Sequence, residues 1–457
     1  MNKSLCIVAV AGCMLFCWAP LSAQDGVSES AQDGASEAES VTASSTQPAE
    51  ESPSAAAPEP FNLLTAKRMT GDWFGLRTDL EDIGFTFSPR LYTNYQGNFS
   101  GGENTAGAHE IPGRFDYNFE LDLNKMVKLP GATFFFRLRQ QWENSIVDDV
   151  GSDSEPYPTF GDNFYGDPNC IIVHKWHYRQ RLFDDRLEIR LGKIDATDYI
   201  DTNEYANSSF TQFSNTFLEN APNVPGERGL GAVMTIWPTD WLYFVAMAVD
   251  PDNVDTKTGF DTAFHGPAHF VASWELGFLP AELVKDAGIL PGHYRVGWWM
   301  RPGESEIFKD TLDGMLASES RWNDVGFYFN MDQVLWKEND KPDDTQGLAG
   351  FMRYSYAHGD VNRYSHFWSL GLVYQGLIPT RDNDLLALGF AQAVTSSQYR
   401  DAIDALADCE SVYEMYYEIE VTPWFKIAPD IQVITNPGGR SDARDAFVGG
   451  LRVNVIF

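Results

Sequence analysis

The chain has 457 residues, of which 65 are Asp or Glu and 33 are Lys or Arg, so its formal net charge is -32. This acidic excess argues against a nucleic-acid-binding protein, because a phosphate-binding surface needs clustered cations. Hydrophobic residues make up 43% of the chain, and after the N-terminus no run of 18 or more apolar residues predicts a transmembrane helix.

Residues 1–23 are typical of a cleaved signal peptide. Lys3 gives the charged start, the stretch 5–18 is apolar, and Ala23 offers a small residue for cleavage. The apolar stretch is too short for an uncleaved anchor that spans a membrane. A lipoprotein site at Cys13 stays open as an alternative, although it leaves a very short apolar region. We therefore expect the chain to be exported.

Residues 24–60 form an acidic, low-complexity tail. The segment 22–29 is nearly repeated by 30–37, and the tail contains several Asp and Glu residues but no Lys or Arg. A segment with so little apolar surface cannot offset its chain entropy, so we expect it to be disordered. It would serve as a periplasmic tether, and the sequence indicates no partner for it.

From residue 61 to residue 457, short segments of alternating apolar and polar residues predict β-strands. In the clearest, 115–124, apolar residues from Phe115 to Leu123 alternate with polar residues without a break. The pattern recurs at 134–139, 175–182, 187–191, 413–421 and 425–433. The polar face is rich in Arg and Glu, which favours a water-filled barrel interior. A large soluble β-sandwich gives the same alternation and stays open as an alternative.

Three short helices are expected among these strands. Asp72 is placed to cap the first, in which Leu76, Leu80 and Ile83 share one face. The second covers 280–288, with Pro at its start and Gly at its end. The third, 400–408, lies in a loop.

Aromatic residues make up 14% of the chain, and many lie at expected strand ends. In membrane barrels such rings form girdles at the two membrane interfaces. The examples expected there are Trp241, Trp274, Trp298, Trp299, Trp336 and Trp424.

The expected connections between strands differ in length. Segments 236–241 and 421–424 predict tight turns, whereas 97–113, 148–167, 250–266 and 434–445 predict long polar loops. This contrast is typical of outer-membrane barrels. At roughly 25 residues for a strand with its connection, residues 61–457 suffice for about 16 strands, a size that leaves an aqueous channel. The predicted fold class is therefore all-β: a transmembrane antiparallel β-barrel of about 16 strands with short N-terminal and loop helices.

The last strand ends with the chain. Leu451, Val453, Val455 and Phe457 alternate with Arg452, Asn454 and Ile456. A terminal aromatic residue on an alternating strand resembles the recognition signal of outer-membrane barrel assembly. An ordinary edge strand would instead leave an exposed hydrophobic edge. We expect outer-membrane lipid and, through Phe457, the barrel-assembly machinery as partners.

The charged residues on the polar faces are the candidate pore-lining residues. A passive channel needs no catalytic residue and no cofactor, only polar groups that exchange hydrogen bonds with a solute. By strand parity the candidates are Glu120, Asp122, Arg137, Arg139, Lys175, Arg179, Arg181, Glu188, Arg190, Glu414, Glu418 and Glu420.

Motifs of an outer-membrane enzyme are absent from the sequence, including a Gly-x-Ser-x-Gly elbow, His-Glu-x-x-His and a phosphate loop. The pairs His174 with His177 and His265 with His269 lie in strand-like context, where their spacing does not converge on a metal. The acids in 250–255 favour an acidic turn over a calcium loop. An enzyme and an adhesive or structural barrel nevertheless stay open as alternatives.

Two cysteines, Cys170 and Cys409, follow the expected signal peptide. Export would permit a disulfide between them. Their separation in space cannot be judged from the sequence, so both the paired and the free state stay open.

Several phrases, taken in order, resemble the carbohydrate-selective porin (OprB) family. They include Thr70-Gly-Asp-Trp-Phe-Gly-Leu-Arg77, in which Phe74 replaces a family glycine, and Gln375-Gly-Leu-Ile-Pro-Thr-Arg-Asp-Asn-Asp384. The strongest combines Thr422-Pro-Trp424 with Asn436-Pro-Gly-Gly439. The resemblance implies a monomer-like barrel of about 16 strands that gives passive passage to small sugars such as glucose. The sequence does not indicate which sugar passes or which loop narrows the pore.

Overall fold

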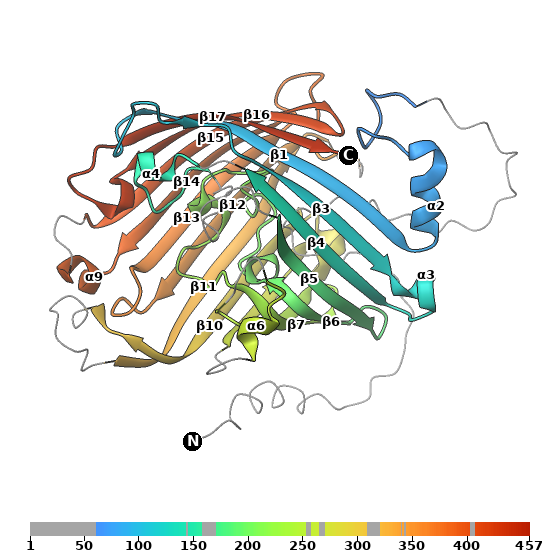
Figure 1. Ribbon diagram of the computed structural model, residues 1–457, viewed down its shortest axis with the longest axis horizontal. Coiled ribbons are helices and arrows are strands. Elements are labelled where there is room, and N and C mark those ends of the chain that lie inside the picture. The colour runs from blue at the N-terminus through green and yellow to red at the C-terminus, as the bar shows by residue number, and fades with distance from the viewer. Residues whose placement is uncertain are drawn as a thin grey trace, which may run out of the picture. The chain divides into compact units, whose positions relative to one another are not determined.

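The computed structural model describes residues 61–142, 145–157, 171–252, 257–264, 270–308, 320–339, 341, 344–402 and 407–457, and only the backbone of Asp286 and Glu306. Within these residues, sixteen long strands and one two-residue strand form a single antiparallel sheet (Figure 1). The strands are β1 (Phe85–Ser100), β2 (His109–Glu110), β3 (Gly113–Asp122), β4 (Ala132–Trp142), β5 (Ile171–Leu182), β6 (Leu187–Asp195), β7 (Arg228–Thr239), β8 (Leu242–Val249), β9 (Val271–Phe278), β10 (Gly292–Glu306), β11 (Ser320–Lys337), β12 (Gly347–Ala357), β13 (Tyr364–Gln375), β14 (Leu385–Thr395), β15 (Cys409–Thr422), β16 (Phe425–Thr435) and β17 (Ala446–Ile456).

The sheet closes into a barrel through its first and last strands. β1 pairs with β17, with Arg90 opposite Ile456, and on its other side with β3, with Phe85 opposite Leu121. Every other long strand pairs with its neighbours in sequence, and β2 adds a short pairing to β1. Closure leaves no long strand with an unpaired edge. The predicted barrel of about 16 strands is confirmed.

Strand alternation produces an outer apolar face and an inner polar face. In β3, Asp116 and Asn118 are buried, whereas Phe115 and Phe119 are partly exposed on the opposite face. The strand ends at Asp122, two residues before the predicted end. The Asp122 carboxylate accepts hydrogen bonds from the backbone N–H groups of Asn124 and Lys125 and caps a short helix, α3 (Leu123–Val127). Such a local cap competes with continued strand pairing.

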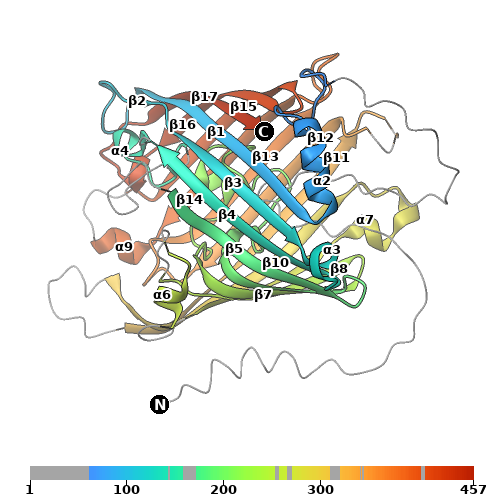
Figure 2. The ribbon, with the colours of Figure 1, turned by 45° about the vertical axis from the view of Figure 1, so that its right-hand side comes forward.

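The barrel has a short-turn end and a long-loop end. At the short-turn end, the turns 183–186, 240–241 and 423–424 join consecutive strands. At the long-loop end, β6 and β7 are joined by residues 196–227, and β8 and β9 by residues 250–270. Figure 2 shows α2, α3 and α7 at the short-turn end and α4, α6 and α9 at the other.

The remaining short helices lie in the connections. They are η1 (Trp73–Gly75), α2 (Leu76–Asp82), α4 (Val147–Val150), η2 (Ala196–Asp198), α5 (Thr216–Glu219), α6 (Phe260–Ala263), α7 (Pro280–Leu283), η3 (Lys285–Ala287), α9 (Ser397–Ala402) and η4 (Pro437–Gly439). In the described parts of the chain, no helix is both long enough and apolar enough to cross a membrane.

The three expected helices are present with shifted bounds. The N-cap of α2 is Gly75, although the Asp72 carboxylate accepts a hydrogen bond from the backbone N–H of Thr78 at 3.0 Å. The segment 280–288 is divided into α7 and η3. The loop helix α9 begins three residues before Arg400, and part of its expected range lies outside the described residues.

One of the expected girdle tryptophans is placed differently. Trp298 is exposed on the outer face and stacks on Trp274 with ring centroids 6.0 Å apart. The expectation for Trp299 is wrong, because this neighbouring side chain points inward and is only 2% exposed. Successive side chains of a strand face opposite sides of the sheet, so adjacent tryptophans cannot both lie on the outside.

The phrase at 375–384 forms the turn between β13 and β14. Arg381 donates hydrogen bonds to both carboxylate oxygens of Asp384 at 2.8 and 2.7 Å. The hydroxyl of Tyr417 and the backbone N–H of Glu420 donate to the same carboxylate. This bidentate pair therefore attaches the turn to β15.

Candidate functional site: the barrel interior

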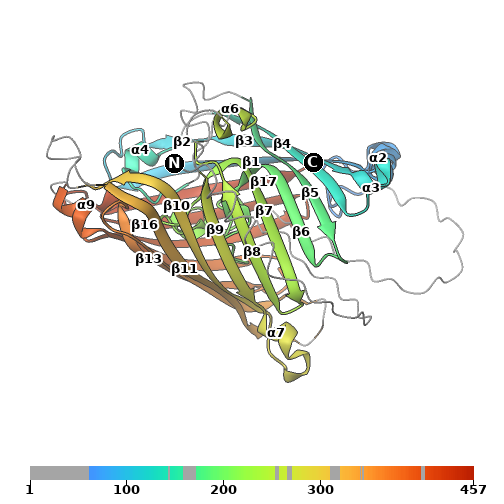
Figure 3. The same cartoon turned by 90° about the horizontal axis from the view of Figure 1, so that it is seen from below.

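Residues 196–227, which we call the in-folded segment, leave the long-loop end and enter the barrel. The segment contacts strands at separate positions around the barrel wall. Arg353 on β12 donates to Asp201, and Asn454 on β17 donates to the carbonyl oxygen of Phe210. Lys175 on β5 donates to Asp198. Figures 1 and 3 show this part of the chain within the barrel. The strand side chains that contact it therefore face the interior.

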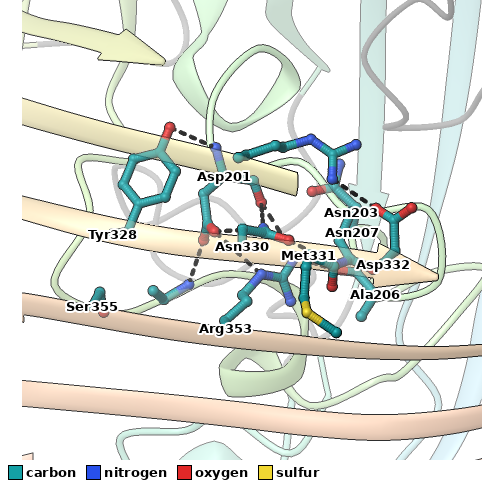
Figure 4. A network of polar contacts seen from close by, with 12 residues as sticks. Asp201, Asn203, Ala206, Asn207, Tyr328, Asn330, Met331, Asp332, Arg353 and Ser355 are labelled. Carbon is teal, nitrogen blue, oxygen red and sulfur yellow. Dashed lines mark hydrogen bonds and ion pairs between the residues drawn. The ribbon is translucent and has the colours of Figure 1, made fainter. Parts of the chain in front are cut away.

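The first anchor of the in-folded segment is centred on Asp201 (Figure 4). The Asp201 carboxylate accepts hydrogen bonds from Asn330 Nδ2 at 2.7 Å and from Arg353 Nε at 3.2 Å. Its backbone N–H donates to Glu275 Oε2 at 3.1 Å. Asp201 has a φ of 53°, a left-handed conformation that is unfavourable for a residue with a side chain. The wall contacts therefore stabilise the segment in a less common backbone conformation.

Arg353 carries much of this anchor. It donates to the carbonyl oxygens of Leu218 at 2.9 Å and of Ala206, in addition to Asp201. Its side chain is 1% exposed, as is that of Asp201. One guanidinium thus joins three points of the segment to the wall.

The second anchor lies on β15, β16 and β17. Glu414 accepts hydrogen bonds from the backbone N–H groups of Ser214 and Asn215 at 2.5 and 3.0 Å. The Asn215 side chain donates to Gln432 Oε1 at 3.0 Å. Arg452 donates to the carbonyl oxygen of Gln212 at 2.5 Å. Buried backbone groups of the segment are in this way paired with side chains of the wall.

The third anchor is basic and lies on β3, β5 and β6. Lys175 Nζ lies 2.6 Å from Asp198 Oδ2, and Arg190 Nη1 donates to the Tyr199 hydroxyl at 3.2 Å. The guanidinium of Arg114 lies 3.1 Å from the centroid of the Phe210 ring. With contacts on three sides, the in-folded segment narrows the interior as a fixed element.

Asp116 is surrounded by arginines on the inner wall. Arg139 binds both oxygens of its carboxylate at 2.7 and 3.0 Å. Arg114 Nε and Arg137 Nη1 lie 3.3 and 3.9 Å from Asp116 Oδ2. Arg137 also donates to Asn118 Oδ1. The Asp116 side chain is fully buried, so one acid partly neutralises three buried cations.

The other candidates on β3 to β6 lie closer to the short-turn end. Arg181 and Arg190 both pair with Glu188, at 3.0 and 2.6 Å. Arg179 lies 4.0 Å from Glu120, whose side chain is 47% exposed. Asp122 is the helix cap described above.

The acidic candidates on β15 fall into two groups. Glu414 is used by the second anchor, whereas Glu418 and Glu420 pair with Lys426 at 2.9 and 3.6 Å. Glu420 also accepts a hydrogen bond from Asn383 in the turn before β14. The sequence candidates thus form a mainly basic cluster on β3 to β6, which includes the acids Glu120, Asp122 and Glu188, and an acidic group on β15.

A second connection narrows the interior near the long-loop end. Glu410 accepts hydrogen bonds from the backbone N–H groups of Asp153 and Ser154 at 3.1 and 2.9 Å. The Tyr157 hydroxyl donates to Asp430 Oδ1 at 2.8 Å. Residues 145–157 are therefore fixed to β15 and β16.

A cavity of about 440 Å³ lies between the two inward-turned connections. Its polar lining includes Asp153, Glu219, Asn220 and Glu227, and Phe217 contributes apolar surface. Burial raises the pKa of Glu219 above its ordinary value, and hydrogen bonds with Ser209 oppose that rise. The cavity offers hydrogen-bonding groups beside an apolar surface.

Sequence reasoning included Lys175, Arg190 and Glu414 among the candidates but missed the residues of the first anchor. Arg353 lies between the outward-facing Met352 and Tyr354, so period-two reading of β12 could have placed it on the inner face. Asn330 and Asp332 likewise alternate with partly exposed neighbours along β11. No local signal in 196–227 indicated that this connection turns inward.

The described residues contain no group of three or more His, Cys, Asp or Glu placed to hold a metal ion. His174 and His177 are buried in β5, and Asp250 accepts hydrogen bonds from Asp252 N and Thr262 Oγ1. His265, His269 and Cys170 lie outside the described residues, so the paired and the free state of Cys170 and Cys409 both stay open.

Comparison with known proteins gives consistent matches. Residues 111–457 match the profile described as "Carbohydrate-selective porin, OprB family". Porin B of Pseudomonas aeruginosa is 24% identical over 437 residues, covering 88% of this chain and 94% of that protein. The high-pH structure of Pseudomonas putida OprB has a TM-score of 0.74 at 21% identity, covering 86% of this chain and 99% of that one. The low-pH structure of the same protein has a TM-score of 0.55 at 18% identity and the same coverage.

Proposed function

Because the chain belongs to the carbohydrate-selective porin (OprB) family, we propose that glucose-like small sugars diffuse passively past its in-folded segment. The chain is a sugar-selective channel of the Gram-negative outer membrane. Short turns are periplasmic and long loops extracellular in such barrels, so a solute enters beside the in-folded segment and leaves at the short-turn end.

The observation that carries the proposal is the charge distribution around the fixed in-folded segment. Buried contacts on three sides hold the segment, and the wall presents Arg and Lys on β4 to β6 and Glu on β15. Sugar hydroxyl groups both donate and accept hydrogen bonds, so a wall with both kinds of partner suits them. Many weak contacts permit entry without trapping the solute.

We assign the twelve charged candidates to three roles. Glu120, Arg179 and Arg181 keep exposed surface and are proposed to meet the passing sugar. Arg137, Arg139, Lys175, Glu188, Arg190 and Glu414 are largely buried in contacts and are proposed to shape the passage. Asp122, Glu418 and Glu420 are proposed to lie at its periplasmic exit.

The first prediction tests transport directly. We expect the purified protein, reconstituted in liposomes, to accelerate swelling in glucose well above protein-free liposomes and more than in a trisaccharide of equal osmolarity. The reason is that the fixed segment limits the size of the solute. Sugar-dependent block of the current in planar bilayers measures binding in the passage. Neither swelling nor conductance would be expected of an adhesive barrel or an enzyme, and that result would exclude the channel.

The N-terminal assignments complete the proposal. Residues 1–23 are proposed to direct export and residues 24–60 to form a periplasmic tether, with 61–457 as the barrel domain. Porins need no catalytic residue, and the porin relatives favour a channel over an enzyme. N-terminal sequencing of the protein purified from outer membranes distinguishes cleavage after Ala23 from lipidation at Cys13.

The second prediction concerns assembly through Phe457. Its backbone N–H donates to the carbonyl of Pro89 at 3.1 Å, and its ring lies 5.2 Å from that of Phe115. We expect deletion of Phe457 to reduce folded protein in outer membranes several-fold while leaving refolding in detergent largely intact. Heat-modifiable mobility on gels measures both, with Val453→Ala as control. Equal loss in cells and in detergent would mean that Phe457 acts only through packing.

A further inference from the structure

The first helix of the barrel domain turns its apolar face away from the protein. Leu76 and Ile83 share one side of α2 and its C-cap and are 54% and 59% exposed. The side turned toward the barrel is polar, because Arg77 is buried and donates to the Phe457 carbonyl oxygen at 3.2 Å. A surface helix of a water-soluble domain has the opposite arrangement.

Phe74, directly before α2, is fully exposed and has a φ of 60°. A bulky residue in this left-handed region is strained, so its position is not explained by backbone preference. Water is an unfavourable surrounding for its ring. The exposed ring points to an apolar medium outside the protein.

Helix α3 extends this apolar surface. Lys125 Nζ donates to the carbonyl oxygen of Glu81 at 2.8 Å, which joins α3 to α2. Figures 2 and 3 show the two helices together at the short-turn end. We define the rim patch as the exposed side chains of both helices and their flanks: Phe74, Leu76, Ile83, Met126, Val127 and Leu129.

The rim patch adjoins the outer face of the barrel. The ring of Trp73 lies 6.2 Å from that of Phe87, which stacks on Phe119 at 4.8 Å. Phe119 belongs to the outer, apolar row of β3. The patch therefore continues the lipid-facing surface at the periplasmic end.

We propose that the rim patch lies in the inner leaflet of the outer membrane, with α2 at the boundary between acyl chains and phospholipid headgroups. Thr78 and Asp82, on the other side of α2, then face the aqueous periplasm. Lys128 is exposed beside the apolar side chains, where its ammonium group reaches headgroup phosphates. This is the arrangement of an interfacial amphipathic helix.

The same segment is attached to the seam where the barrel closes. The backbone N–H of Met69 donates to the carbonyl of Ile456 at 2.8 Å, and Trp424 Nε1 donates to the carbonyl of Leu63 at 2.6 Å. A membrane-anchored α2 therefore also holds residues 63–77 against the end of β17.

Photocrosslinking tests the proposal. p-Benzoyl-phenylalanine replaces Phe74 or Ile83, or, as the matched control on the other side of the same helix, the exposed Thr78. Each full-length variant is reconstituted in phosphatidylethanolamine–phosphatidylglycerol vesicles, checked for the heat-modifiable mobility of a folded barrel, irradiated and analysed by mass spectrometry.

We expect phospholipid adducts at positions 74 and 83 and none at position 78. Equal lipid adducts at all three positions, or none at 74 and 83, would overturn the proposal. Adducts between two copies of the chain at position 74 would overturn it as well, because they identify the patch as a protein interface.

Discussion

Replacing Arg353 by alanine is expected to widen the pore while the barrel stays folded. The single-channel conductance should rise, and the preference for monosaccharides over larger sugars should fall, because the in-folded segment loses its main attachment to β12. The segment itself contributes little to closure of the barrel, which depends on pairing between neighbouring strands.

The size of this effect follows from the burial of the pair. Arg353 and Asp201 are each 1% exposed, and removing one member of such a pair leaves a buried charge without its partner. Breaking a buried ion pair costs about 3–5 kcal/mol. The carbonyl groups of Leu218 and Ala206 lose a donor in addition. The remaining contacts of Asp201 with Glu275 and Asn330 must then hold its left-handed backbone without Arg353, so we expect the segment to leave its fixed position.

Planar-bilayer conductance and liposome swelling in sugars of graded size measure the result. Met352→Ala is the matched control, since Met352 is the neighbouring residue on β12 and its side chain is on the outer face. Unchanged conductance and unchanged size selectivity in a folded Arg353→Ala protein would mean that the other two anchors suffice to hold the segment.

The barrel wall could be predicted from sequence because its signal is local. Alternation along 115–121 or 413–421 is read from adjacent residues, and each long strand pairs with its neighbours along the chain. Two expectations about the wall were wrong. The end of β3 was misplaced because Asp122 caps α3 instead of continuing the strand. Trp299 was expected outside because it is apolar, but its position in the strand turns it inward.

The in-folded segment could not be predicted because its contacts are distant in sequence. Asp201 meets Arg353 across 152 positions, and Ser214 meets Glu414 across 200. Parity placed Glu414 on the polar face but gave no reason for it to bind backbone N–H groups. The charged residues were therefore predicted as a set, whereas the division between anchoring and exposed members required the structure.

Replacing Asp116 by asparagine is expected to lower stability and to make the pore more selective for anions. The side chain keeps its shape, but Arg114, Arg137 and Arg139 lose their shared negative partner. Removing one partner from such a buried group costs about 3–5 kcal/mol. The lost negative charge also leaves the inner wall more basic, and charges that face a barrel interior tune ion selectivity.

Urea unfolding in vesicles measures the stability, and the reversal potential in a KCl gradient measures the selectivity. Asp240→Asn is the matched control, because Asp240 pairs with Arg186 at 2.8 Å in an exposed turn. An exposed pair contributes at most about 1 kcal/mol, and its field is screened by salt. If Asp116→Asn shifts the reversal potential and Asp240→Asn does not, the arginines around Asp116 face the ion passage.

Charge reversal of Arg137 and Arg139 together is less informative, since it would place two acids against Asp116. Repulsion between these acids would then change the stability together with the ion selectivity. A stable Asp116→Asn protein with an unchanged reversal potential would place the ion path away from β3 and β4.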